Sequence, residues 1–470
     1  MANIKFIGRE SEIKEIGEIR KGSFFLVVKG RRRIGKTTLL RRALPEAANI
    51  FVWPDKSLDW MLPVICQEHG LPSFRNFSGI VEYLLDNKKT VIIDEFQNFL
   101  GVDKSVFGEL QKTIDERKLK GKPIKIAVAG SSYSLMNKVF NDAASPLYGR
   151  RTHEMTVDNL PIRELFQELK VPIEEFVKTW AVFEGVPYYY ELLDKKLPAE
   201  KNLFRLLLSK EAQLQGEGRL LLSSEFGRES RTYGTVLTAI SEGKTKLSEI
   251  ASLFGNKKNE AIKYLDILRK EFRFVRKNTP ITSMPEKSRE GKYEIIDNFL
   301  SFWFFFAEKK RNYIEQERFE ELEKFFKENF TAFVGKKFEK FVIKLIKSKL
   351  LLKEFPCTKI GQQWGKTSQE KGKNTYEIDI AMLNEETKSA LFAECKWQEN
   401  VNTQTIALQL AEKARHVEWH NNERQEQYAI FAKTFSKKIT QLEGKKVHCI
   451  SLKEIEKALQ KAKKIKNPPR

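Results

Sequence analysis

A short segment near the start of the chain combines the residue types that bind a nucleoside triphosphate. Residues 30–37 read Gly-Arg-Arg-Arg-Ile-Gly-Lys-Thr and fit the pattern G-x-x-x-x-G-K-[ST] without a mismatch. In such a loop the glycines let backbone N–H groups surround the phosphates, and the following helix adds positive potential at its N-terminus. Lys36 would reach the β- and γ-phosphates, and the Thr37 hydroxyl would bind Mg²⁺. The predicted contacts of ATP in this loop are Gly30, Arg33, Ile34, Gly35, Lys36, Thr37 and Thr38.

A carboxylate pair further along the chain could supply the other half of this site. The strand-like run of residues 90–93 ends in Asp94 and Glu95. Asp94 would hold Mg²⁺ through water, and Glu95 would orient or deprotonate the water that attacks the γ-phosphate. The alternative is an acidic strand end without a catalytic role.

Two further polar residues could complete the nucleotide site. An apolar strand at residues 124–129 is followed by Gly-Ser-Ser, where Ser131 or Ser132 could sense the γ-phosphate, although an ordinary turn would look the same. Arg150 could reach a phosphate in its own subunit or in a neighbouring one, which would make the protein a homo-oligomer. A solvated arginine pair, Arg150 with Arg151, is the alternative.

A second set of residues suited to phosphate chemistry lies in the last third of the chain. Residues 376–382 and 391–397 alternate as strands, and the polar stretch between them can turn the chain. Pairing them as a hairpin could bring Asp379, Glu394 and Lys396 together. Carboxylates that bind Mg²⁺ or Mn²⁺, beside a lysine that positions the nucleophile, suit metal-assisted phosphodiester hydrolysis. Asp379 and Glu394 are the predicted metal ligands, and an exposed acidic hairpin is the alternative.

The elements around the first site follow from its flanking residues. The apolar run of residues 23–28 predicts a buried parallel strand that leads into the phosphate-binding loop, and residues 38–44 predict a helix that ends before Pro45. With the strands at residues 90–93 and 124–129, this pattern predicts a parallel sheet between helices.

The middle of the chain contains a pattern typical of a winged helix-turn-helix. Residues 232–275 predict three helices and the first strand of a wing. Between residues 244 and 277, ten basic side chains stand against four acidic ones. Lys257, Lys258 and Lys263 lie at the start of the predicted recognition helix, where DNA contacts would form. Alternatively, the module packs on the nucleotide domain as a switch and does not contact DNA.

Composition limits the class of protein. The chain has 470 residues and a formal net charge of +21, and about 150 residues per domain suggests three domains. The longest apolar run, residues 299–307, is far shorter than the roughly 20 residues that span a bilayer. The first ten residues lack the apolar stretch of a signal peptide. We therefore expect a cytoplasmic protein without a membrane contact, whose positive charge favours nucleic acid as partner.

The N-terminal motifs together resemble a known family. Residues 6–10 (Phe-Ile-Gly-Arg-Glu), the phosphate-binding loop, Asp94-Glu95, residues 130–132 and Gly149-Arg150 are similar to those of the archaeal ATPases, which are STAND and AAA+-like P-loop NTPases. The resemblance implies that the Phe-x-Gly-Arg-Glu segment packs beside adenine. It also implies that Pro187, in a G-x-P motif, lines the base. The family often has a glycine where this chain has Glu184.

The C-terminal motifs resemble the PD-(D/E)xK nuclease superfamily. The resemblance assigns Glu339 as the helix carboxylate, Asp379 as the first acid of the hairpin, and Glu394-x-Lys396 as the E-x-K motif, although Ile378 replaces the usual proline. A nuclease fold retained for dimerisation or binding is the alternative. The expected fold is α/β: a P-loop ATPase core at 1–160, a helical extension at 161–230, a winged helix-turn-helix at 231–310, and a restriction-endonuclease-like domain at 325–470.

The leading hypothesis is an ATPase that binds DNA and carries a metal-dependent deoxyribonuclease. Its predicted catalytic residues are Glu95 and Arg150 for ATP hydrolysis, and Glu339, Asp379, Glu394 and Lys396 for DNA cleavage. ATP binding would control access to the second site. The rival hypotheses are a regulatory STAND-type switch and a replication-initiator-like DNA-binding ATPase, in both of which the nuclease fold is only a platform.

Overall fold

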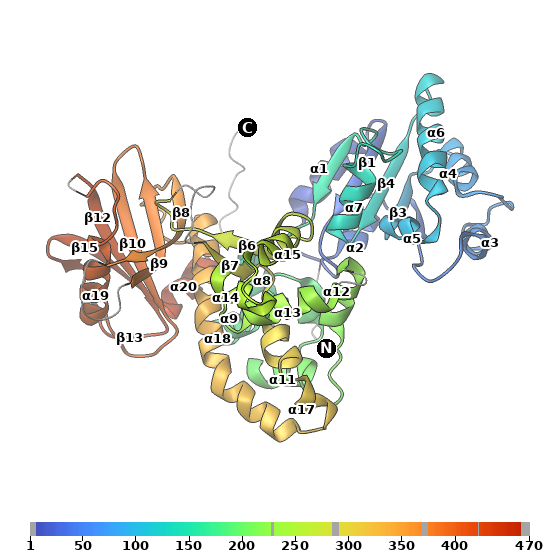
Figure 1. The fold of residues 1–470 in the computed structure, drawn as a ribbon. Helices are drawn as coiled ribbons and strands as arrows, with labels where there is room; N and C mark the ends of the chain where they lie inside the picture. The colour runs from blue at the N-terminus through green and yellow to red at the C-terminus, as the bar shows by residue number, and fades with distance from the viewer. Residues whose placement is uncertain (1–5, 227–229, 284–290, 368–374, 422, 462–470) are drawn as a thin grey trace.

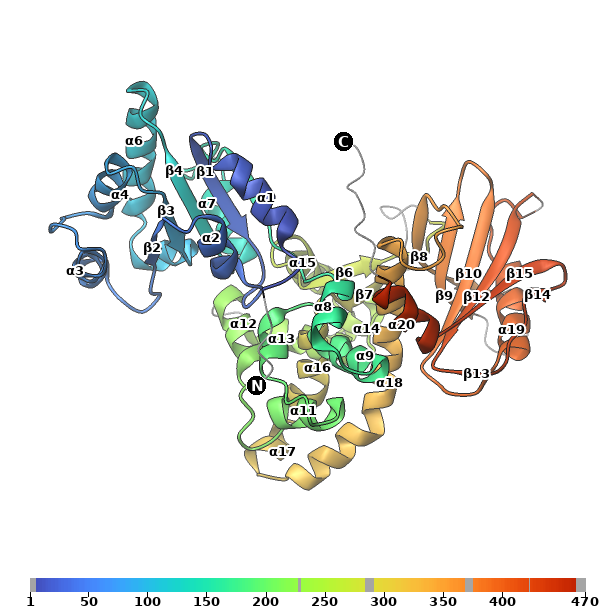
Figure 2. The same ribbon diagram turned by 180° about the vertical axis from the view of Figure 1, so that it is seen from behind.

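Two large β-sheets lie at opposite ends of the molecule, with a group of helices between them (Figure 1). The view from behind shows the same separation (Figure 2). The computed structural model describes residues 6–226, 230–283, 291–367, 375–421 and 423–461. No helix within these ranges is long and apolar enough to cross a membrane.

The N-terminal sheet is parallel and has the strand order β2-β3-β4-β1-β5. Side chains alternate along β1, so that Leu26 and Val28 pack with α1 and α2, whereas Phe25 and Val27 pack with the helices of the other face. This confirms the predicted sheet between helices. The strands are β1 (Phe24–Lys29), β2 (Ala48–Phe51), β3 (Val91–Asp94), β4 (Lys125–Gly130) and β5 (His153–Thr156). The helices are α1 (Glu10–Ile19), α2 (Lys36–Ala43), α3 (Leu58–His69), α4 (Phe77–Asp86), η1 (Phe96–Asn98), α5 (Phe99–Val102), α6 (Ser105–Leu119) and α7 (Tyr133–Phe140).

This strand order places the predicted ATP-site residues together. The loop after β1, the carboxylates at the end of β3 and the serines after β4 all follow the carboxyl ends of neighbouring strands. Ligands of open α/β sheets bind at that edge.

The middle of the molecule is helical and shares one hydrophobic core with the N-terminal and C-terminal parts. Its first group of helices is α8 (Ile162–Leu169), α9 (Ile173–Phe183), α10 (Pro187–Glu191), α11 (Ala199–Leu207) and α12 (Glu217–Phe226). Three helices and a two-stranded antiparallel ribbon follow, in the order predicted for a winged helix-turn-helix. They are α13 (Ser230–Ser241), α14 (Leu247–Ala251) with η3 (Ser252–Phe254), α15 (Lys258–Lys270), β6 (Val275–Asn278) and β7 (Lys292–Ile295).

A dense aromatic segment connects this ribbon to the C-terminal part. Phe299, Phe302 and Phe306 are fully buried. Phe302 and Phe306 pack against Phe333 of the long helix α18, whereas Phe299 stacks on Tyr189 of α10. The segment comprises α16 (Asn298–Phe302), the π-helical η4 (Trp303–Glu308), α17 (Arg311–Glu315) and α18 (Phe319–Lys347). The boundary predicted at residue 325 therefore falls inside α18, the helix that also carries Glu339.

The C-terminal sheet is mixed, with the strand order β14-β15-β12-β10-β9-β8. β8, β9 and β10 are antiparallel, whereas β10, β12 and β15 are parallel. Helix α19 packs on one face, and α18 with α20 on the other. The strands are β8 (Lys359–Lys366), β9 (Thr375–Asn384), β10 (Ser389–Lys396), β12 (Gln425–Ala432), β14 (Gln441–Leu442) and β15 (Lys445–Ser451). The remaining elements are α19 (Thr403–Arg415), α20 (Leu452–Gln460) and the β11 (Val401–Asn402) and β13 (Phe435–Lys437) pair.

Candidate functional site

The phosphate-binding loop connects β1 to α2 and has the backbone that its glycines predict. Gly35 has φ +92°, a conformation that side chains disfavour. A Cβ on Gly30 would lie 2.8 Å from the carbonyl oxygen of Val157, so this position has no room for a side chain. Ile34 is buried beneath the loop, whereas Thr38 is exposed in the first turn of α2.

Lys36 lies folded back on its own loop. Its Nζ donates to the carbonyl oxygens of Gly30 at 3.0 Å and Arg31 at 3.1 Å. Burial lowers the pKa of Lys36, while the charges of Glu95 and Asp94 oppose that shift. The ammonium group therefore lies in a buried loop, and a phosphate group could replace the two carbonyl contacts.

Thr37 and Asp94 form the predicted pair of Mg²⁺ ligands. The Thr37 hydroxyl donates to Oδ2 of Asp94 at 2.5 Å, which joins the first turn of α2 to the end of β3. Burial raises the pKa of Asp94 above its ordinary value. A hydroxyl beside a buried carboxylate is the oxygen donor set that Mg²⁺ takes in P-loop sites, so these residues fit the ion.

Glu95 is held by residues from two strand ends. Its Oε2 accepts from Ser131 Oγ at 2.7 Å and from Gln97 Nε2 at 2.6 Å. The predicted sensor and the predicted base therefore touch. Sequence reasoning missed Gln97, a buried side chain whose spacing from Glu95 matches no motif.

The G-x-P motif lies beside the phosphate-binding loop, and the role of Pro187 in lining the base stays a prediction. Pro187 begins α10, and a Cβ on Gly35 would be 3.9 Å from Pro187 Cγ. A Cβ on Gly185 would lie 2.4 Å from the carbonyl oxygen of Leu160, which explains the glycine. Arg9, of the Phe-x-Gly-Arg-Glu segment, is buried and donates to the carbonyl oxygen of Ile34 at 3.2 Å.

Arg150 does not lie with these residues. Its guanidinium pairs with Asp115 of α6, with Nη2 at 2.9 Å from Oδ2. The structure thus gives this side chain a partner away from the loop. Action on a phosphate in a neighbouring subunit remains a prediction.

Two arginines of the loop point away from the predicted phosphate position. Arg31 Nη1 is 2.8 Å from Asp297 at the start of α16, and Arg33 Nη2 is 2.8 Å from Glu217 of α12. The Arg33 guanidinium also lies 3.9 Å from the Tyr188 ring centroid. The Arg33 side chain is therefore held by Glu217 and Tyr188, and the predicted contact of Arg33 with ATP would have to come from its backbone N–H. Sequence reasoning missed both partners, because the variable positions of the motif carry no pairing signal.

Glu184 forms a further buried ion pair, which connects the end of α9 to α18. Its Oε1 is 2.6 Å from Lys340 Nζ and 3.5 Å from Lys344 Nζ. These lysines and Arg31 lower the pKa of the buried Glu184 to about 2, against the desolvation that opposes them. Lys340 also donates to Oδ1 of Asn298 at 2.9 Å, the residue after Asp297. Glu184, which stands where the family often has a glycine, thus forms a buried ion pair with Lys340 of α18, the helix that carries Glu339.

The hairpin of β9 and β10 brings three of the predicted C-terminal residues together. The register places Glu394 beside Asp379, and Asp379 Oδ2 accepts from the backbone N–H of Cys395 at 2.8 Å. Lys396 Nζ donates to Glu394 Oε1 at 2.8 Å. Lys413 of α19, which sequence reasoning missed, donates to Glu394 Oε2 at 2.9 Å.

Glu339 of α18 is close enough to Asp379 for the two carboxylates to interact. Burial and the charge of Asp379 raise the pKa of Glu339 well above its ordinary value. Burial and the charge of Glu394 raise the pKa of Asp379 to about 6. Glu339 Oε2 accepts from Gln362 Nε2 at 3.0 Å. Asp379 therefore interacts with two carboxylates, those of Glu339 and Glu394, and a cation there would relieve their repulsion.

The carboxylates are not arranged as a complete metal site. Within the described ranges, no group of three or more His, Cys, Asp or Glu side chains is placed to hold a metal ion. Asp379 and Glu394 supply carboxylate oxygens of the right chemistry, but two lysine ammonium groups lie against Glu394. An ion would have to displace at least one of them.

Comparison with known proteins identifies the N-terminal module. Residues 23–166 match the family model described as AAA domain, and residues 303–408 match one described as "Archaea bacterial proteins of unknown function". The chain is 31% identical over 414 residues to the uncharacterized protein MJECL04 of Methanocaldococcus jannaschii, and the match covers 84% of this chain and 88% of that protein. The chain belongs to the same family.

Solved structures similar to this chain, a member of the MJECL04 family, were also found. One is the Walker-type ATPase PABY2304 of Pyrococcus abyssi, with a TM-score of 0.48, 18% identity, and coverage of 64% of this chain and 96% of that one. Another is Cdc6p from Pyrobaculum aerophilum, with a TM-score of 0.30, 12% identity, and coverage of 67% and 96%. The AAA match supports ATP binding and hydrolysis by this MJECL04 relative, with Mg²⁺ as the accompanying ion. The C-terminal match names no activity, so the nuclease assignment stays a prediction.

Proposed function

We propose that this ATPase binds DNA and that its C-terminal domain cleaves phosphodiester bonds with a divalent metal ion. The observation that carries the proposal is the meeting of Asp379, Glu394 and Lys396 at one end of the β9–β10 hairpin. Glu339 adds a further carboxylate from α18, and burial together with the charge of Asp379 raises its pKa. Such clusters are typical of functional sites.

The chemistry divides among the residues by their positions. Mg²⁺ or Mn²⁺, when bound, would activate water and bear the charge that develops on the phosphate. Asp379 and Glu394 would hold it. Lys396 would leave Glu394 and place its ammonium group on the attacking water or on the scissile phosphate.

Cleavage assays test this proposal directly. Plasmid, linear duplex and single-stranded DNA are incubated with Mg²⁺ or Mn²⁺, and products are resolved on gels. We expect cleavage by the unaltered protein and at least a 100-fold loss in Asp379→Ala/Lys396→Ala, the usual cost of removing groups that act on the reacting phosphate. The matched control is Lys359→Ala/Glu385→Ala, an exposed ion pair near the hairpin turn. No cleavage, or equal cleavage by both double variants, would refute the nuclease assignment.

ATP turnover tests the other half. In Lys36→Ala the loop loses the ammonium group that would reach the β- and γ-phosphates, so ATP affinity and turnover should both fall. Isothermal titration and phosphate release measure the two quantities. Unchanged affinity and turnover would remove the ATPase assignment for this loop.

A regulatory ATP switch is the second candidate, and the arginine pairs favour it. Arg31 and Arg33 connect the phosphate-binding loop to Asp297 and Glu217, which lie on the modules that lead to α18. ATP would then control access to Asp379 or control assembly. Oligomerisation that depends on ATP, measured by light scattering, with no strand scission in the cleavage assay, would favour the switch over the nuclease.

DNA contact by the predicted recognition helix is a separate part of the proposal. Lys257 and Lys258 are exposed at the start of α15, and neither forms an ion pair within the described part of the chain. In Lys257→Glu/Lys258→Glu, duplex affinity should fall and its salt dependence should flatten. An unaltered salt slope would exclude this helix as the contact.

A further inference from the structure

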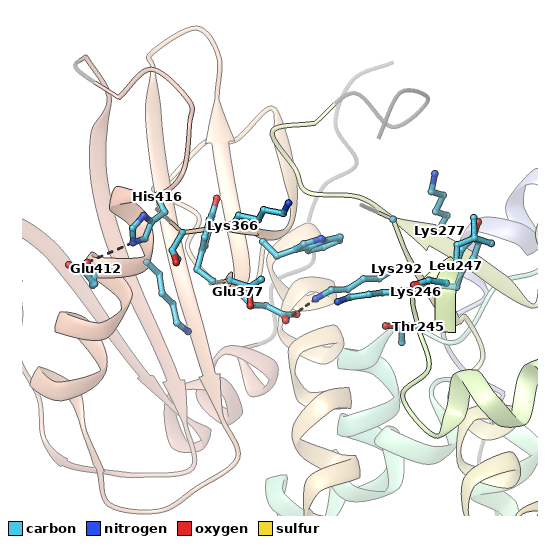
Figure 3. Close-up of a pocket in the computed structure, with 18 of the residues that line it drawn as sticks. Thr245, Lys246, Leu247, Lys277, Lys292, Lys366, Glu377, Glu412 and His416 are labelled. Atoms are coloured by element: carbon cyan, nitrogen blue, oxygen red, sulfur yellow. Dashed lines mark hydrogen bonds and ion pairs between the residues drawn. The ribbon is translucent and has the colours of Figure 1, made fainter. Parts of the chain in front are cut away.

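A cleft of about 1260 Å³ lies between the β6–β7 ribbon and the C-terminal sheet (Figure 3). The ribbon side carries Lys246, Lys277 and Lys292, whereas the sheet side carries Lys366 and Glu377. Lys413 and His416 of α19 line its far end. The cleft therefore separates two parts of the chain that the sequence treats as different domains.

The lining of the cleft is strongly basic. Six lysines line it, against two glutamates. Glu377 is paired with Lys292 at 2.8 Å, and Glu412 with Arg415 at 3.1 Å. The six lysines are Lys246, Lys258, Lys277, Lys292, Lys366 and Lys413.

Three of these lysines have charge available for a ligand. Lys246, Lys258 and Lys366 are exposed, and none forms a salt bridge to a described residue. They stand on both sides of the cleft, Lys246 and Lys258 on the ribbon side and Lys366 on the sheet side. A ligand that paired with all three lysines would need several negative charges spread along its length, as the sugar-phosphate backbone of a nucleic acid has.

The floor of the cleft is aromatic and held in place. Tyr293, Trp364 and Tyr376 line it, and each is more than nine-tenths buried. Lys292 Nζ lies 4.5 Å from the Trp364 ring centroid, and the Tyr376 and His416 ring centroids are 5.7 Å apart. These rings are too buried for bases to stack on them, so they hold the walls of the cleft in place. The lysines form the basic groove that can follow the backbone of a single strand.

The cleft leads to the carboxylates of the candidate nuclease site. Lys413 lines the cleft and donates to both carboxylate oxygens of Glu394. Glu377 lines the cleft on β9, two residues before Asp379. A strand lying on the lysines would therefore pass beside Asp379 and Glu394.

We propose that this cleft binds a single strand of nucleic acid and guides its backbone to Asp379 and Glu394. The binding step stands on the cleft alone, and the delivery of a scissile phosphate rests on the proposed nuclease function. The volume is larger than the 300–1,000 Å³ typical of small-molecule pockets.

Binding is measured separately from cleavage. A fluorescein-labelled single strand is titrated with the full chain in EDTA, without divalent ions, at several salt concentrations, and anisotropy gives the affinity. In Lys246→Glu/Lys366→Glu we expect affinity to fall at least tenfold at 100 mM salt. The slope of log affinity against log salt should fall by about 1.4, because each lost phosphate contact on a single strand contributes about 0.7. The control is Lys89→Glu/Lys104→Glu, which reverses two exposed lysines of the ATPase module.

The outcomes separate the cleft from the nuclease. If the control and the cleft variant lose affinity equally, or if neither does, the cleft is not the binding site. If a matched duplex binds tighter than the single strand and is equally weakened by Lys246→Glu/Lys366→Glu, the single-strand assignment is wrong. Binding through the cleft without cleavage in Mg²⁺ or Mn²⁺ would uphold the cleft and refute the nuclease. Equal melting temperatures and equal ATP affinity in the two double variants verify that both are folded.

Discussion

At the scale of single residues, the orientation of Glu95 depends on Ser131 and on Gln97, a neighbour that no motif contains. Gln97 and Ser131 both donate to the same carboxylate oxygen, so the second oxygen faces a fixed direction. Glu95 itself has φ +52°, which sets its side chain on a turn between β3 and η1. A carboxylate that orients water must be held in this way, because misplacement of a catalytic group slows the reaction more than it weakens substrate binding.

Removing Gln97 should therefore lower ATP turnover selectively. In Gln97→Ala we expect kcat to fall by about tenfold, the lower end of the usual cost of losing a positioning residue, with KM for ATP unchanged. Steady-state phosphate release measures both. Ser134→Ala is the matched control, since the Ser134 hydroxyl donates to Glu225 rather than to Glu95. A rise in KM with kcat unchanged would show that Gln97 shapes the ATP pocket instead of positioning Glu95.

At the scale of elements, the buried pair between Glu184 and α18 fastens the helical extension to the C-terminal part. The carboxylate that ends α9 contacts Lys340 and Lys344 one turn apart on α18, and it lies within reach of the backbone N–H of Asn298 at 3.5 Å. Breaking one side of a buried pair leaves the other charge without a partner. This contact is therefore a stability determinant as well as a bridge.

The pH dependence of unfolding should report this pair. The pKa of Glu184 is about 2 in the folded chain and ordinary in the unfolded one, so its stabilisation is fully present above pH 4.5 and is lost as pH falls toward 2. The pKa difference corresponds to about 3 kcal/mol. We expect Glu184→Gln to lower the unfolding free energy at pH 7 by about that amount, and the difference between the two proteins to shrink progressively below pH 4.5 and to vanish as pH approaches 2. Urea unfolding followed by circular dichroism measures the difference.

The control for that experiment is an exposed carboxylate of the same helical group. Glu200 pairs with Lys178 at the surface, so Glu200→Gln should change the unfolding free energy by less than about 1 kcal/mol. An equal effect of the two substitutions, or an effect of Glu184→Gln that does not diminish on acidification, would contradict the assignment of the stabilisation to this buried pair.

At the scale of the whole molecule, one polar route joins the two candidate sites. It runs from Arg31 in the phosphate-binding loop to Asp297, continues through Asn298 to Lys340, and ends one residue from Glu339. The N-terminal, helical and C-terminal parts also share one core, so movement of one part strains the others. ATP that drew Arg31 or Arg33 toward its phosphates would weaken their pairs with Asp297 and Glu217.

Hydrogen exchange can test this coupling. In the unaltered chain, we expect ATP binding to change the exchange of amides in α18. In Asp297→Asn/Glu217→Gln the loop arginines lose their charged partners, so the response in α18 should shrink by at least half while ATP still binds. The comparison is with Asp115→Asn, which removes a partner of Arg150 outside the route. An undiminished α18 response in the double variant would exclude the route.

The sequence by itself determined the local chemistry. Motifs whose spacing is set by one loop or one strand, such as Gly30 to Thr37 or Glu394 to Lys396, could be located because their geometry is local. The parallel N-terminal sheet and the buried aromatic segment around Phe299 also follow from patterns of apolar residues. The tertiary structure alone decided which charges meet: Arg31 with Asp297, Glu184 with Lys340, and Lys413 with Glu394. Such pairs join residues far apart in the chain, and an ion pair leaves no periodic signal in either partner. The basic cleft is undetectable in sequence for the same reason, because its two walls come from segments about a hundred residues apart that only packing brings face to face.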